Sequence, residues 1–221
     1  TNHVLAGEAT SSDLMSGYYS TLSATGFGDA TTSLYVNLDN GVILNGGPEV
    51  VAADVDVDNG VIHGVDAVIL PPTVVDFATS NPGLSSLVAA LTRSDLNTDF
   101  VGALSGDGPF TVFAPTNAAF DKLPKGTVEG LLKPEAKDKL TAVLTYHVVA
   151  GEFNAAAVVE AIKKSKGKFV IKTVQGGELT ASLKGKNVIL TDGAGNTSTV
   201  VIADVKASNG IIHAIDTVVL P

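Results

Sequence analysis

Apolar and polar positions follow two different periods along this 221-residue chain. In the stretch from Asn81 to Leu104 apolar side chains recur at the three- and four-residue spacing of a helix, and Asn81 and the proline after it form a start signal. After His147 the chain changes to short apolar runs separated by glycine and asparagine, which predict strands joined by turns. These predicted strands are 169–174, 178–185, 187–192, 199–205 and 211–220. The helices therefore come first and the sheet follows.

Turn, cap and proline residues indicate where the next elements begin. Residues 106–109 predict a turn into a short strand, 110–114. Thr116 and Asn117 come next and offer a cap for a helix. Pro134 opens a further helix that carries apolar residues on one face.

Two stretches of the chain recur with nearly the same sequence. "NGVIHGVDAVILP" (59–71) returns as "NGIIHAIDTVVLP" (209–221), at a constant offset of 150, and "NHVLAGE" (2–8) returns as "YHVVAGE" (146–152), at an offset of 144. The helical segments before residue 146 have no first copy. We therefore interpret residues 73–221 as one whole unit, the complete unit, and residues 1–72 as the C-terminal half of another, the half unit.

Three motifs carry a resemblance to a known family. "TVFAPTNAAF" (111–120), "YHVVAG" (146–151) and "NGIIHAIDTVVLP" (209–221), in this order, closely resemble the fasciclin domain family. The match covers 73–221, whereas 1–72 matches only from the "YH" motif onward. The resemblance implies an α+β fold, a fasciclin-like β-wedge or sandwich with a small helical bundle. It also implies an extracellular or cell-surface protein, often built of tandem repeats, that binds other proteins, matrix, cells or glycans.

Composition excludes several classes of function. A net charge of −9 argues against a nucleic-acid partner, which needs clustered lysine and arginine. The absence of cysteine excludes disulfides, thiolate zinc sites and thiol nucleophiles. No apolar run is long enough to predict a membrane span in this chain.

All four histidines lie at landmarks of the repeat. His3 and His147 share one motif, and His63 and His213 share the other. Nothing nearby supplies further ligands at metal-site spacing, so we expect no metal and no cofactor; we expect each imidazole to bond a backbone carbonyl and fix local geometry. Metal ligation and a role in binding are the weaker alternatives. Further structural roles are expected for the other landmark residues, namely Thr116, Asn117, Asn209, Gly210 and Asp216.

Tyr146 and His147 match the tyrosine–histidine motif to which cell binding is attributed in some animal members of the family. The apolar residues beside the pair favour burial instead, which would make it a hinge between the helices and the sheet. The half unit has Asn2 in place of the tyrosine.

Two further patterns have candidate chemistry. Asp54, Asp56 and Asp58 have the first spacings of a calcium loop, but the later positions of that loop do not match, so solvated acids on a strand are expected. Asn196 opens the glycosylation acceptor "NTS" in a predicted hairpin loop.

A strand-rich half unit leaves apolar residues without the helices that would cover them. Three explanations are open. The half unit is a remnant of a longer tandem chain; or another copy completes it, giving a head-to-tail fibre or other homo-oligomer; or it folds differently, packing on its own segment 10–32 and on the complete unit. Segment 13–26 is a candidate replacement helix with a glycine stop.

These observations favour a secreted or cell-surface adhesion module that binds other proteins or surface glycans without catalysis. A structural subunit of an extracellular fibre or matrix is the first alternative. An extracellular hydrolase is the second, although no catalytic motif supports it.

Overall fold

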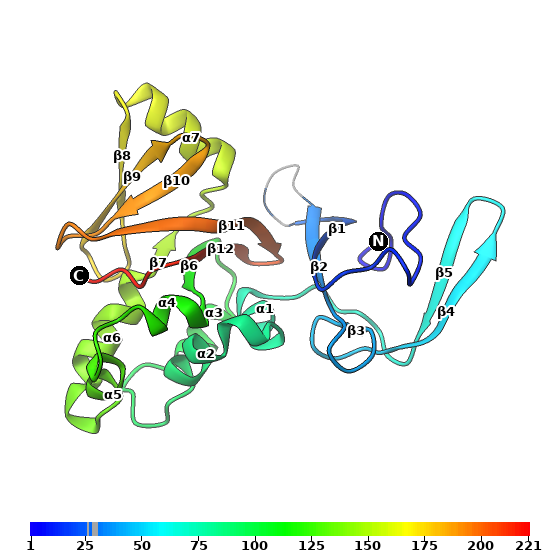
Figure 1. The fold of residues 1–221 in the computed structure, drawn as a ribbon, viewed down its shortest axis with the longest axis horizontal. Helices are drawn as coiled ribbons and strands as arrows, with labels where there is room; N and C mark the ends of the chain where they lie inside the picture. Colours follow the sequence, from blue (N-terminus) through cyan, green and yellow to red (C-terminus); the bar gives the residue numbers. More distant parts are fainter. Residues whose placement is uncertain (26, 28–30) are drawn as a thin grey trace.

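The computed structural model describes residues 1–25, 27 and 31–221. The two units lie end to end along the long axis of the molecule (Figure 1). The N-terminus lies in the half unit and the C-terminus in the complete unit. Residues 72–73, after the last repeated residue of the half unit, form the linker between them.

The complete unit begins with helices, as predicted. Thr73 starts the first of them with a capping box, in which its side chain and that of Asp76 each bond the other's backbone N–H. The helices, including two short 3₁₀ turns, are α1 (Val74–Ser80), η1 (Pro82–Leu84), α2 (Ser85–Leu91), α3 (Phe100–Leu104), α4 (Asn117–Asp121), α5 (Thr127–Leu131), η2 (Pro134–Ala136), α6 (Lys137–Tyr146) and α7 (Ala155–Lys164).

A seven-stranded sheet carries the rest of the complete unit. Its strands are β6 (Phe110–Pro115), β7 (Val148–Ala150), β8 (Lys168–Lys172), β9 (Glu178–Lys184), β10 (Asn187–Thr191), β11 (Thr197–Ala207) and β12 (Gly210–Ile215). They lie in the order β7-β6-β12-β11-β10-β9-β8. β12 pairs with β6 in parallel, whereas the other neighbours are antiparallel. The parallel pair joins the N-terminal and C-terminal parts of the unit.

Two apolar cores lie on opposite sides of β6 and β12. Helices α1, α2, α3 and α6 cover one side, where Val112 of β6 and Ile212 of β12 are buried. Helix α7 covers the other side, where Phe113 of β6 and Ile215 of β12 are buried. Alternate residues of each strand therefore serve different cores.

The half unit is built of strands, and its described residues form no helix. Its strands are β1 (Gly17–Ala24), β2 (Thr31–Asn37), β3 (Ile43–Leu44), β4 (Val50–Val57) and β5 (Gly60–Val65). β1, β2 and β3 form one antiparallel sheet, and β4 and β5 form a hairpin that projects at the right of Figure 1. By the repeat, β4 and β5 are the counterparts of β11 and β12. Leu34, Val36, Leu44 and Ile69 form the small apolar core of the half unit.

The replacement helix predicted for 13–26 is wrong. Residues 17–24 form strand β1, because Tyr18 and Tyr19 pair across to Tyr35 and Leu34 and the Thr21 hydroxyl bonds Thr32. The glycine stop at residue 26 lies outside the described residues. Segment 10–32, as far as it is described, does pack within the half unit.

Three helices were not predicted. α1 follows directly after the linker, α5 lies between the helix capped by Thr116 and the one opened by Pro134, and α7 interrupts the region read as strands alone. Asn154 caps α7 by accepting the N–H of Ala157, and lysines 163 and 164 lie in its last turn. The observed proportions of helix and sheet agree with the predicted α+β class.

Tyrosines of the half unit pack on the complete unit. The ring of Tyr18 lies edge-on to Phe77 of α1, with 5.6 Å between centroids, and its hydroxyl accepts a 2.8 Å bond from the Asn81 amide. Tyr35 is buried in the same core. The contact is continuous with the helical core of the complete unit.

Candidate binding surface

The turn between β11 and β12 holds the two parts of the complete unit together. The buried side chain of Asn209 accepts the N–H of Val74 at 2.9 Å and donates to the carbonyls of Leu104 and Gly106, each at 2.8 Å. One amide thus bonds the start of α1 and the end of α3.

Gly210 follows and lies against β6. A Cβ at this position would be 2.2 Å from the carbonyl oxygen of Phe110, so only glycine allows the strands to approach so closely. The contacts with α1, α3 and β6 therefore account for the presence of asparagine at 209 and glycine at 210.

The half unit retains both residues without those contacts. Asn59 is exposed, and a Cβ on Gly60 would meet nothing within 4 Å. The same two residues that are locked in place in the complete unit face open space here.

Apolar residues show the same contrast. Ile62 is 53% exposed and its counterpart Ile212 is 2% exposed, while Val68 is 69% exposed and Val218 is 3% exposed. The contrast defines a surface that we call the open face, made of Val55, Val57, Asn59, Gly60, Ile62, Val68 and Leu70. In the complete unit the counterparts of these apolar residues pack on α1–α4 and α6.

A cavity of about 460 Å³ opens behind β5. Val61, His63 and Val65 line it from β5, and Leu34 and Val36 line it from β2. In the complete unit, the side chains of Phe113 and of α7 residues pack at the equivalent position beside β12. The cavity and the open face together form the least covered part of the half unit.

The histidines make the same bonds in both units. His63 Nε2 lies 2.8 Å from the Ala9 carbonyl, and His213 Nε2 lies 2.7 Å from the Phe153 carbonyl. Each Nδ1 accepts the backbone N–H of an aspartate in the left-handed region, Asp54 or Asp204. Burial lowers the pKa of His213. These imidazoles hold a β-bulge to a preceding loop.

The other pair of histidines bonds the C-terminal segment of each unit. His3 Nε2 accepts the N–H of Ile69 at 3.0 Å, and His147 Nε2 accepts that of Val219 at 3.4 Å. His147 Nδ1 also lies 2.7 Å from the Val143 carbonyl. Burial lowers the pKa of His147 to about 4, so the ring is neutral at pH 7.

Tyr146, like His147, lies in the interior, with 1% and 3% of their surfaces exposed. The tyrosine hydroxyl donates to the Glu178 carbonyl at 2.6 Å and accepts the N–H of Gly193 at 3.0 Å. Burial raises the pKa of Tyr146. The pair joins α6 to the sheet, and its direct contact with a partner stays a prediction.

Thr116, Asn117 and Asp216 also bond neighbouring elements. Thr116 caps α4, and the Asn117 amide donates to the Pro82 carbonyl at 2.9 Å. Burial opposes ionisation of Asp216, but bonds from the Thr199 N–H and the Lys122 ammonium hold its pKa below the usual value.

The acidic run and the glycosylation acceptor lie on the surface. Asp54 accepts two bonds from Ser11, which hold its pKa below the usual value, and Asp56 and Asp58 are exposed. Within residues 1–25, 27 and 31–221, no group of three or more metal-ligating side chains occurs. Asn196 is exposed in the turn between β10 and β11, where its amide bonds Asp192 at 3.1 Å.

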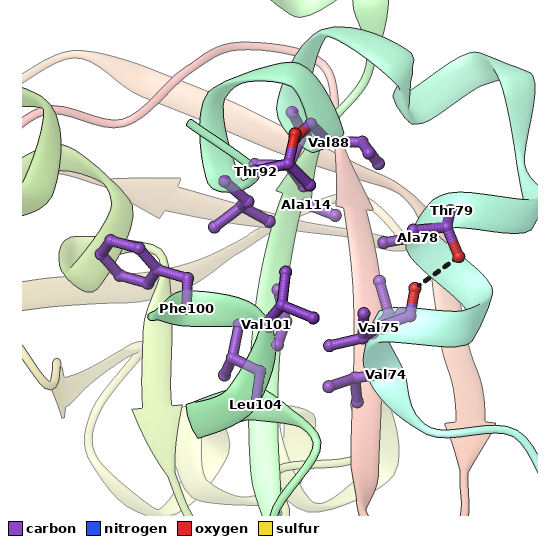
Figure 2. Close-up of a pocket in the computed structure, with 14 residues that line it drawn as sticks. Val74, Val75, Ala78, Thr79, Val88, Thr92, Phe100, Val101, Leu104 and Ala114 are labelled. Atoms are coloured by element: carbon purple, nitrogen blue, oxygen red, sulfur yellow. Dashed lines mark hydrogen bonds between the residues drawn. The ribbon is translucent and has the colours of Figure 1, made fainter. Parts of the chain in front are cut away.

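The helical bundle contains two further apolar hollows. Figure 2 shows the smaller, of about 30 Å³, where side chains of α1, α2 and α3 meet over β6. The hydroxyl of Thr79 in its wall is already bonded to the Val75 carbonyl, which leaves the lining apolar. Its small volume admits only a group the size of a water molecule. The larger, of about 190 Å³, lies among α2, α4, α5 and α6 and includes His147 in its wall. Neither brings polar groups together for catalysis.

Each unit also turns one valine outward at a β-bulge. The register of β4 shifts next to Val51 and that of β11 shifts next to Val201, and these valines are 65% and 53% exposed. The sequence analysis did not single them out, although the repeated "VV" before "AAD" and "IAD" marks the position.

A family model assigns this architecture. The fasciclin domain model matches residues 1–71 and 82–221. The chain belongs to the fasciclin domain family. The resemblance seen in the sequence is thereby confirmed, and so is the fasciclin-like fold.

Fasciclin relatives come from several organisms. Protein sll1483 of Synechocystis sp. is 50% identical over 149 residues, which are 67% of this chain and 73% of the relative. The cell surface glycolipoprotein MPB83 of Mycobacterium bovis is 39% identical over 150 residues, 67% of this chain and 60% of the relative.

A solved structure shares the fold. The FAS1 domain pair from the insect cell adhesion molecule Fasciclin I superposes with a TM-score of 0.64 at 21% identity. The superposition covers 92% of this chain and 67% of the Fasciclin I chain. In the described part of this fasciclin protein, no helix is long and apolar enough to cross a membrane.

Proposed function

We propose that this fasciclin protein is an extracellular or cell-surface adhesion protein that binds other proteins or surface glycans without catalysis. MPB83 is named as a cell surface protein and Fasciclin I as a cell adhesion molecule, which supports the role. The observation that carries the proposal is the outward valine repeated in both units, Val51 and Val201. β-Bulges often re-aim side chains at functional positions, and exposed apolar side chains favour protein contact.

The test measures adhesion directly. Beads carrying the chain are passed over an array of immobilised extracellular proteins and glycans. We expect retention above that of albumin-coated beads, and we expect the double variant Val51→Asp, Val201→Asp to reduce it at least about tenfold, because about 1.4 kcal/mol of lost contact corresponds to that factor.

A matched control uses an exposed valine elsewhere. Val170 is 50% exposed on the edge strand β8, which β9 and β10 separate from β11, so Val170→Asp should leave retention unchanged. Equal loss in the control and the double variant, or no retention of the parent chain, would contradict the proposal.

The non-enzymatic part has its own experiment. The chain is assayed against a panel of chromogenic esters and glycosides. We expect no turnover. A measurable rate that disappears in His147→Ala or His213→Ala protein with an unchanged circular dichroism spectrum would show a hydrolase.

A further inference from the structure

We propose that the open face binds the helix-first half of a fasciclin unit, the part equivalent to residues 73–144. One strand of that partner lies parallel to β5, and one of its aromatic side chains fills the cavity beside His63. The inference goes beyond the adhesion role and does not depend on it.

The free edge of β5 supplies the backbone for this contact. In the complete unit, β12 pairs with β6 in parallel through six residue pairs, from Gly210–Phe110 to Ile215–Pro115. β5 pairs with β4 along one edge, and within the described residues no strand lies along the other. An unpaired edge of this kind is a template for strand addition.

Gly60 and Asn59 identify the strand that fits. Their counterparts, Gly210 and Asn209, contact β6, α1 and α3, whereas no described atom of the half unit lies within 4 Å of a Cβ placed on Gly60. The space beside Gly60 is free, so the backbone of a partner strand can approach it as closely as β6 approaches Gly210.

The cavity identifies the side chain. In the complete unit the Phe113 ring of β6 stacks on His213, with 5.7 Å between centroids, and is 2% exposed. The corresponding space in the half unit is the cavity of about 460 Å³ lined by His63. A strand in the β6 register places an aromatic side chain there.

The other side of β5 identifies the rest of the partner. Val55, Val57 and Ile62 are 49%, 43% and 53% exposed, and their counterparts are buried under the helices of the complete unit. Helices following the strand would cover these residues in the same way.

A second folded copy of the chain does not meet these requirements. Its β6 is already paired on one edge with β12 and on the other with β7. The occupant is therefore the helix-first half of a unit, with its strand unpaired, and this face does not fit head-to-tail assembly of intact copies.

The experiment supplies such a half. A second copy of residues 73–144 is attached ahead of Thr1, so that Leu144 leads into "TNHV" as it leads into "TYHV" in the complete unit. Hydrogen exchange is then followed by mass spectrometry. In the extended protein we expect the amides of residues 61–65 to exchange at least about a hundredfold more slowly than in the parent chain.

Gly60→Ala is the discriminating variant. Because the φ of Gly60 is +156°, alanine strains the backbone in both proteins alike, so each variant is compared with its own unsubstituted protein. The added protection should disappear in the extended protein, where the Cβ would also meet the new strand, whereas the parent chain, where the Cβ meets open space, should show only the effect of the strain. Protection that survives Gly60→Ala would contradict the proposed register. Slow exchange at 61–65 in the parent chain, at concentrations where it dimerises, would show that a second copy covers the face and would overturn the proposal.

A peptide tests the same contact without the extension, in case the extended protein does not fold. The peptide of residues 108–116, added to the isotopically labelled parent chain, should shift the amide resonances of residues 60–65 and the imidazole of His63. The same peptide with Phe113→Lys should not. If neither the extension nor the peptide alters β5, the proposal is wrong.

Discussion

His147 keeps a neutral imidazole in the interior of the protein, because burial lowers its pKa from 6.5 to about 4. The unfolded chain therefore takes up a proton first as the pH falls. The contribution of this residue to stability is complete above pH 6.5 and decreases as the pH drops toward 4. His213 acts in the same direction.

We predict that acidification from pH 7 to pH 5 lowers the free energy of unfolding by about 2 kcal/mol through His147 alone. Urea denaturation at several pH values measures it. The variant His147→Gln cannot titrate in this range and should lose that part of the dependence. Asp216, whose pKa lies below 3.8, becomes relevant only at lower pH. Identical slopes for the parent and the variant would refute the assignment.

The roles of single residues could be predicted from the sequence only in outline. The repeat singled out Asn209, Gly210 and the histidines, because a residue kept in both copies points to a local requirement. Their partners lie far away along the chain: Asn209 bonds Val74, 135 positions earlier. Spacing along one sequence carries no information about such contacts.

The parallel pairing of β12 with β6 decides whether the complete unit holds together. We predict that Gly210→Ala destabilises the protein by roughly 1–3 kcal/mol, since the added Cβ would overlap the Phe110 carbonyl. Gly60→Ala, at the same position of the half unit, carries the same backbone strain, with a φ of +156° against +159° for Gly210, but no overlap with a neighbouring strand, so it should cost less stability than Gly210→Ala. Thermal unfolding of both variants makes the comparison, and similar losses would show that β12 and β6 can separate without cost.

Most helices and strands with clear turn and cap residues at their ends were predicted correctly, and those without such residues were not. The strand 110–114 and the cap at Thr116 were evident from their turn and cap residues, and they appear as β6 and α4. Segment 13–26 has a helix-like run of small and apolar residues, yet pairing with β2 makes residues 17–24 a strand. α7 was missed although Asn154 and the alanines after it are a recognisable start.

Tyr18 makes an aromatic contact and a side-chain hydrogen bond between the two units. We predict that Tyr18→Ala loosens the half unit from the complete unit, because the ring leaves Phe77 and the hydroxyl bond to Asn81 is lost. Small-angle scattering should show a larger radius of gyration. Tyr19→Ala removes a ring whose hydroxyl bonds only Met15 within the half unit, and it should leave that radius unchanged. An unchanged radius in both variants would place the joint elsewhere.

For the molecule as a whole, the sequence predicted one and a half repeats and the apolar residues that the missing helices leave uncovered. It left open that the half unit packs on the complete unit, but it did not single out Tyr18 and Tyr35 as the residues that join the helical core. That contact has no counterpart inside either repeat, so comparing the copies could not reveal it.

The linker and β2 of the half unit are also bonded to the end of β11 and to the turn that follows it. Ser208 N–H bonds the Pro72 carbonyl at 2.7 Å, and Lys206 N–H bonds the Ser33 hydroxyl at 2.9 Å. A mechanical load applied between the two ends of the chain does not pass through the linker peptide alone. Part of it enters the middle of the seven-stranded sheet, so tension is shared by the strands before the units can be pulled apart.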